Sequence, residues 1–142
     1  MATPATLTSQ QTLEAQVTGP GGATRVIIVT GLATCSLNTA VPSPGGGFGT
    51  QQGTFSAHVG PTLTVAQFRR AVATVSLTSL SATGSVTTHS WAITDVDASF
   101  DDDEGRVELE FDVQVTVQGP PMPGFTQVML ASVGFQVTIL AA

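Results

Sequence analysis

A strict alternation of apolar and polar residues between 106 and 118 constrains the fold of this chain more than any other feature. Apolar side chains recur at every second position, and charged, amide or hydroxyl side chains fill the positions between them. The apolar set is Val107, Leu109, Phe111, Val113, Val115 and Val117. A period of two puts these side chains on one face of a β-strand, whereas a helix would spread them around its axis. The segment therefore predicts a strand with one buried face.

The preceding segment, 87–100, predicts a hairpin partner for this strand. Trp91 and Ile93 occupy odd positions, whereas Val96, Ala98 and Phe100 occupy even positions. A change of parity within one strand indicates an extra residue, so we expect a β-bulge near Thr94 and Asp95. The short polar segment 101–105 ends in Gly105, which can supply the positive φ that such a connection needs.

Shorter apolar stretches predict further strands, separated by segments rich in Gly and Pro. These strands are expected at 13–18, 24–37, 54–59, 74–82 and 125–139. A helix competes with strand structure at 64–73, because Thr64 and Gln67 have the spacing of a capping box. Residues 39–53 are rich in Gly and Pro and predict a long flexible loop.

Together these elements predict an all-β fold. We expect a single antiparallel β-sandwich, or a flattened barrel, of about seven to nine strands with at most one short helix near 64–73. One domain is expected to span residues 1–142, because a chain of 142 residues has a common size for one domain with its own core.

The charge content limits the partners that this chain can bind. Charged residues make up 10% of the sequence, against roughly 25% in a typical domain. A net charge of −6 with four scattered arginines and no lysine argues against nucleic acid, whose phosphates bind basic groups. The most apolar stretch, 125–142, is short and broken by polar residues, so no membrane partner is expected.

The first residues and the cysteine content predict an intracellular location. The N-terminal segment has neither the basic region nor the apolar region of a secretory signal. Cys35 is the single cysteine, which excludes a disulfide within one chain. We therefore expect a cytoplasmic protein, or part of a particle that assembles inside the cell.

Nine of the ten carboxylates lie between Asp95 and Asp112, and with Arg106 they give this window a net charge of −8. Clustered carboxylates are typical calcium ligands, so Asp101, Asp103 and Glu104 at the hairpin tip are candidate ligands. The alternative is a solvated hairpin whose charges discourage pairing with another sheet edge. The spacing does not complete an EF-hand loop, and we favour the solvated hairpin.

Catalytic chemistry has little support in the sequence, and we expect neither an enzyme nor a cofactor. Cys35 lies in an apolar strand, where a buried thiol is usually inert. His58 and His89 each lie in a strand with no acidic residue close by in sequence to orient them. Trp91 alternates with Ile93, which favours a place in the core over a sugar-stacking platform.

Two functions remain as hypotheses. The first is a structural subunit of a shell, a tube or a virion-type particle, which forms homo-oligomers or joins a larger protein assembly. Its expected interface contains Val137, Ile139 and Leu140 of the uncharged C-terminal strand, together with Arg69 and Arg70. The second is a β-sandwich module that binds calcium or carbohydrate through the acidic hairpin 95–112.

Overall fold

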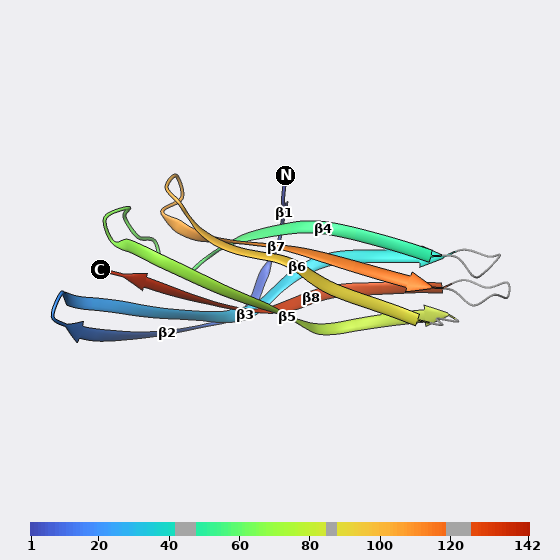
Figure 1. Cartoon of the computed structure of the whole chain (residues 1–142), viewed down its shortest axis with the longest axis horizontal. Helices are drawn as coiled ribbons and strands as arrows, with labels where there is room; N and C mark the ends of the chain where they lie inside the picture. The colour runs from blue at the N-terminus through green and yellow to red at the C-terminus, as the bar shows by residue number, and fades with distance from the viewer. Residues whose placement is uncertain (42–47, 85–87, 119–125) are drawn as a thin grey trace.

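The computed structural model describes residues 1–41, 48–84, 88–118 and 126–142, with the backbone alone at 38, 40, 41, 48, 79–84, 88, 89 and 126–128. Eight strands in this part of the chain form two four-stranded sheets (Figure 1). Their bounds are β1 (Thr3–Pro4), β2 (Leu7–Gly19), β3 (Gly22–Val41), β4 (Phe48–Val59), β5 (Phe68–Gly84), β6 (Thr88–Asp101), β7 (Arg106–Gln118) and β8 (Thr126–Ala141).

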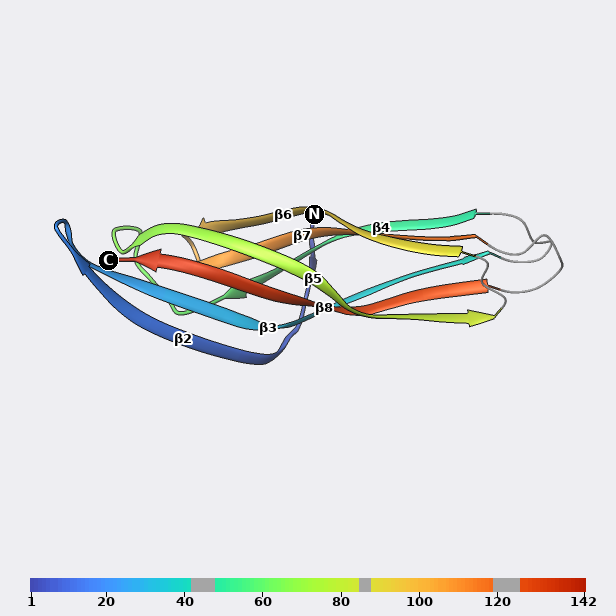
Figure 2. The same cartoon turned by 60° about the horizontal axis from the view of Figure 1, so that its bottom comes forward.

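Sheet A has the strand order β1-β4-β7-β6, and sheet B has the order β2-β3-β8-β5. The sheets pack on each other along their long axes, so the domain is an elongated sandwich (Figure 2). The expected all-β sandwich is therefore confirmed. The expectation of a purely antiparallel fold is wrong for sheet A, because β1 pairs with β4 in parallel.

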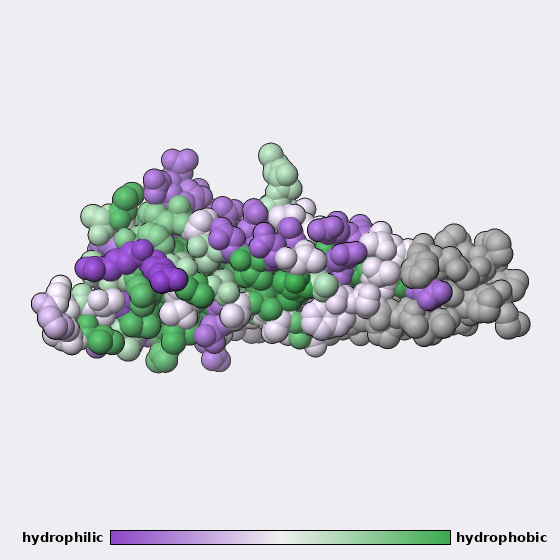
Figure 3. All heavy atoms as spheres, in the orientation of Figure 1, coloured by the Kyte–Doolittle hydropathy of each residue, from purple (hydrophilic) through white to green (hydrophobic). Residues whose placement is uncertain are grey.

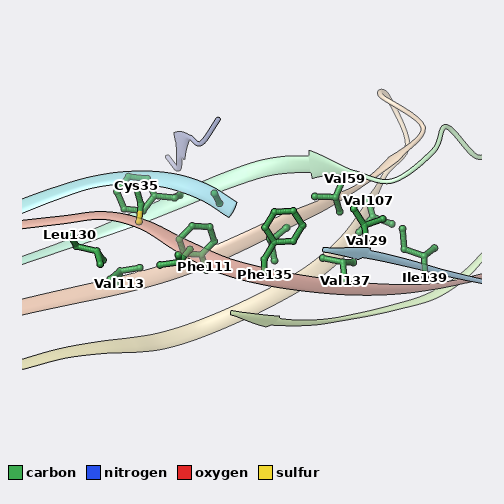
Figure 4. Close-up of a cluster of buried hydrophobic side chains, with 14 of the residues drawn as sticks. Val29, Cys35, Val59, Val107, Phe111, Val113, Leu130, Phe135, Val137 and Ile139 are labelled. Atoms are coloured by element: carbon green, nitrogen blue, oxygen red, sulfur yellow. The ribbon is translucent and has the colours of Figure 1, made fainter. Parts of the chain in front are cut away.

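The core lies between the inner faces of the two sheets. As predicted, β7 buries every second residue from Val107 to Val117, and it lies between β4 and β6 in sheet A. The facing strands of sheet B contribute Val137 and Ile139, both with no exposed surface (Figure 4). Ile27 of the same sheet is also fully buried. Residues of period two on two facing sheets thus meet in one apolar layer.

Aromatic contacts support this layer at two places. Phe55 and Phe111 stack across β4 and β7, with ring centroids 5.8 Å apart. Phe68 of β5 stacks on Phe100 of β6 at 4.7 Å, which joins the edge strands of the two sheets. Stacked aromatic pairs stabilise a core beyond the area that they bury, so the first contact stabilises the inner face of sheet A and the second helps to fix the two sheets on each other.

The short helix expected near 64–73 does not form. The capping box does form: the backbone N–H of Thr64 donates to Gln67 Oε1 at 2.9 Å, and that of Gln67 donates to Thr64 Oγ1 at 3.3 Å. A single turn follows, and β5 begins at Phe68. The stacking of Phe68 on Phe100 and the pairing of β5 with β8 replace helix propagation. The predicted capping box is thus confirmed, whereas tertiary packing determines the structure that follows it.

Two further predictions can be compared with the strand register. The bulge expected near Thr94 and Asp95 is confirmed, because the pairing of β6 with β7 shifts between Ile93 and Asp95. The predicted range of the loop, 39–53, is too wide, because β3 continues to Val41 and β4 begins at Phe48. Residues 42–47 of that loop lie outside the described part of the chain.

In the part that is described, no helix is long and apolar enough to span a membrane.

Candidate functional site

The outer face of sheet A carries the acidic residues of β6 and β7. Even-numbered residues of β7 point away from the core, and residues directly opposite in a paired strand share their face. Asp95 pairs with Asp112, and Asp97 pairs with Glu110. We call this surface the acidic face, and it consists of Asp95, Asp97, Asp101, Glu108, Glu110 and Asp112. Like charges directly opposite each other are destabilising, so this face favours a bound cation or full hydration.

His58 of β4 brings an imidazole to one end of the acidic face. It pairs directly with Glu108 of β7, and its Nε2 lies 2.8 Å from Oδ2 of Asp101 in β6. The other oxygen of Asp101, Oδ1, accepts the backbone N–H groups of Asp103 at 3.0 Å and Glu104 at 3.3 Å. These bonds hold the pKa of Asp101 below its ordinary value, with the hydrogen bond to His58 as the largest cause.

In the described part of the chain, His58, Asp101 and Glu108 form the one group of three potential metal ligands whose ligand atoms all lie within 4.8 Å of one another. All three residues are half-buried. Of the predicted calcium ligands, Asp101 belongs to this group, whereas Asp103 and Glu104 are exposed and bond to Asp101 through their backbone. The structure therefore does not bring the three predicted calcium ligands together as a ligand set.

Replacing Asp101 with asparagine is expected to lower the melting temperature at neutral pH and to change it little in acid. A lowered folded-state pKa means that the carboxylate stabilises the fold fully above its ordinary pKa. This contribution is lost as the pH falls through the lower, folded-state pKa. Thermal melts of both proteins from neutral pH to about pH 2 test this prediction. A difference in melting temperature that stays constant over this range would contradict it.

The outer face of sheet B, in contrast to that of sheet A, carries apolar side chains. Cross-strand pairing puts apolar side chains from all four strands of this sheet on one surface. We call it the apolar face, and it consists of Leu13, Val17, Val26, Ile28, Val72 and Leu140. Leu13, Val17 and Val72 are 65%, 56% and 52% exposed. Hydrophobic residues are visible on the surface in the half of the molecule that holds the β2–β3 turn and the C-terminus (Figure 3).

A groove of about 500 Å³ adjoins the apolar face along the same sheet. The groove is lined by a row of polar residues next to the row of Leu13 and Ile28, namely Thr30, Gln136 and Thr74. Ser76, which also lines the groove, lies one row further along. Gly134 also lines the groove, where the side chains of Thr78 and Ser76 approach it so closely that a Cβ would lie 3.2 Å from Thr78 Cγ2. The apolar face is thus bordered by hydroxyl and amide groups that can form hydrogen bonds.

The predicted assembly interface is divided between the core and the surface. Val137 and Ile139 have no exposed surface, because they lie on the inner face of β8 and belong to the core between the two sheets. These two side chains are therefore not available to a partner of the folded domain, and their assignment to an interface needs correction. Leu140 is half-buried on the apolar face, where it pairs with Arg70 of β5, and Arg69 is exposed beside it.

The remaining candidate residues give no catalytic arrangement among the described side chains. Cys35 is fully buried, and burial raises the pKa of its thiol to about 11. His58 is bonded to Asp101 of another strand, and the side chain of His89 lies outside the described part of the structure. Trp91 is 41% exposed on the edge strand β6, so its expected place in the core is wrong.

These features define a two-sheet β-sandwich with one acidic and one apolar outer face. In comparisons with protein-family models, curated proteins and solved structures, nothing matches the chain. The two outer faces are therefore the features of the molecule that bear on its function.

Proposed function

We propose that this chain is a structural subunit that assembles with copies of itself through the apolar face. The observation that carries the proposal is the exposure of large apolar side chains on one sheet surface. One row across the four strands consists, in order, of Leu13, Ile28, Thr138 and Val72. The flanking row adds Val26, Leu140 and Arg70. Monomeric proteins rarely expose a contiguous apolar patch larger than a few hundred Å², and such a patch usually marks an interaction site.

The size of this surface suits contact between two copies. Strands about 4.8 Å apart and rows about 6.7 Å apart give roughly 500 Å² for the three rows of the apolar face together with the adjoining groove row of Thr30, Gln136 and Thr74. Two such faces stacked on each other bury roughly 1,000 Å² in total, which reaches the lower limit of specific interfaces. The hydroxyl and amide groups of the adjoining groove can form the polar rim that interfaces usually have.

The charges of the molecule favour pairing of like faces. Contact of the apolar face with the acidic face of another copy would take carboxylates such as Glu110 out of water without a partner, which is costly. Stacking of two apolar faces keeps both acidic faces hydrated. Arg69 and Arg70 lie on the edge strand β5, where they can stay at the rim of the contact.

The exposed edge of sheet B also supports assembly. β2 is the outermost strand of its sheet, and every residue after Leu7 in it is exposed. The strand contains neither Lys nor Pro, two residues that commonly protect a sheet edge from pairing. Its Glu14 is engaged in an ion pair with Arg25 at 2.7 Å. An edge of this kind is suited to burial beside or beneath another subunit.

Replacing Leu13 with aspartate is expected to separate the subunits without unfolding them. Leu13 is 65% exposed on the apolar face, so the new charge stays hydrated in the monomer and is desolvated only in the assembly. Val65→Asp is a matched control, because Val65 is 64% exposed and lies in the turn before β5. Light scattering measures the mass of each variant. The proposal fails if the mass of Leu13→Asp equals that of the wild type, or if both variants dissociate equally.

A further inference from the structure

We propose that His58, Asp101 and Glu108 bind one divalent transition-metal ion, with Zn²⁺ as the best-suited ion. The site lies on the outer face of sheet A and does not depend on contact between subunits. Three adjacent strands build it: β4 supplies the imidazole, β6 one carboxylate and β7 the other. The imidazole distinguishes these residues from the rest of the acidic face, where carboxylates stand opposite one another without a histidine.

The distances in the group suit a metal ion with small adjustments of the side chains. All three ligand atoms lie within 4.8 Å of one another, and Nε2 of His58 is 2.8 Å from Oδ2 of Asp101. Two ligands bound at about 2.0–2.1 Å to one tetrahedral zinc ion lie about 3.3 Å apart. Bringing an ion between these two atoms therefore separates them by about 0.5 Å, and a change of rotamer can bring Glu108 closer.

Asp101 is held in position to act as a ligand. Its Oδ1 accepts the backbone N–H groups of Asp103 and Glu104 at the hairpin tip, which leaves Oδ2 directed at His58. Hydrogen bonds of this kind orient ligand carboxylates in metal sites and reduce the entropy that binding must overcome. The acidic tip thus contributes to the site through its backbone, although Asp103 and Glu104 are not ligands.

The local charge favours a cation. Asp101 and Glu108 bring two carboxylates to one site, and the nearest arginine in the sequence, Arg106, donates its Nε–H to the carbonyl oxygen of Gly60 at 3.0 Å. In the described part of the structure, Arg106 forms no ion pair with either carboxylate. A divalent ion would neutralise both carboxylates at once, which a single imidazole does not do.

The ligand types select the class of metal. Calcium and magnesium prefer oxygen ligands, and calcium takes six to eight of them, so a site with an imidazole and two carboxylates suits neither well. Zinc accepts nitrogen and oxygen ligands, and its open sites have three protein ligands with a fourth position for water or another molecule. The side chains of His58 and Asp101 are 33% and 26% exposed, so solvent can reach a fourth position.

Calorimetric titration of the purified protein with Zn²⁺, and separately with Ca²⁺, tests the proposal. We expect one Zn²⁺ ion per chain, and we expect His58→Gln and Glu108→Gln each to weaken binding by about tenfold or more. Two matched controls should bind like the wild type. His89→Gln removes the other histidine of the chain, and Glu110→Gln removes a neighbouring carboxylate of the acidic face.

Circular dichroism and urea unfolding establish that each variant is folded, and Glu108→Gln tests the proposal if His58→Gln does not fold. Running the same titrations on Leu13→Asp keeps the outcome independent of self-assembly. The proposal is overturned if His58→Gln binds zinc as tightly as the wild type does. It is overturned as well if Glu110→Gln loses as much affinity as Glu108→Gln, or if Ca²⁺ binds as tightly as Zn²⁺. Each of those results would indicate general attraction of cations by the acidic face.

Discussion

Replacing Ile139 with aspartate is expected to unfold the domain. Ile139 has no exposed surface and lies on the inner face of β8, between β3 and β5. An unpaired carboxylate at this position costs about 4 kcal/mol or more, in addition to the lost apolar burial. Together these costs are of the same order as the stability of a typical domain, about 5–15 kcal/mol, so we expect a large loss of folded protein. Far-UV circular dichroism and urea unfolding measure the effect.

Leu140→Asp is the matched comparison, because it changes the adjacent residue on the opposite face of the same strand. Leu140 is half-buried on the apolar face, where the new carboxylate can reach water in the monomer. We therefore expect this variant to keep its circular dichroism spectrum and to lose self-association. A folded Ile139→Asp variant, or equal unfolding of the two variants, would contradict the assignment of the two faces of sheet B.

Replacing Phe111 with alanine is expected to lower the free energy of unfolding by about 3–5 kcal/mol. Phe111 is 1% exposed in the middle of β7, and its ring stacks on Phe55. The substitution removes this contact and leaves a cavity between two sheets whose backbones are fixed by pairing on both sides. The midpoint and slope of urea unfolding give the change in free energy.

Trp91→Ala provides the comparison for Phe111→Ala. Trp91 is larger, but it is 41% exposed on the edge strand β6, so its removal leaves no enclosed cavity. We expect the free energy of unfolding of this variant to fall by about 1 kcal/mol or less. If Trp91→Ala lowers the free energy of unfolding as much as Phe111→Ala does, or more, the core does not lie between β7 and the facing sheet.

Local pattern was sufficient to predict the strands but not their neighbours. The alternation of β7 fixes which residues face inward, and the parity change in β6 locates its bulge. Whether a strand lies at an edge or in the middle depends on partners far away in sequence. The uncharged C-terminal segment predicts an interface with another subunit, whereas pairing with β3 and β5 makes β8 the interior of sheet B. Its apolar composition is explained by that burial.

The sequence also predicts only part of the ligand group on the acidic face and only part of the apolar face. The acidic segment predicts Asp101 as a candidate ligand, but His58 lies 43 positions earlier, and only the register of β4 on β7 brings it to Glu108. Of the apolar face, the sequence predicts only Leu140 as an interface residue, for a similar reason. Leu13, Ile28 and Val72 occur in separate segments, each with an ordinary alternating pattern, and sheet pairing joins them into one surface. A contact between distant segments has no local signal.

The mass of the wild-type protein in solution tests the central claim of self-assembly most directly. Sedimentation equilibrium over a dilution series into the high micromolar range is the appropriate measurement. Assembly through the apolar face predicts a mass of at least twice the 14.5 kDa of one chain, falling toward the single-chain value on dilution. A mass of one chain at every concentration, including the highest, would contradict the claim.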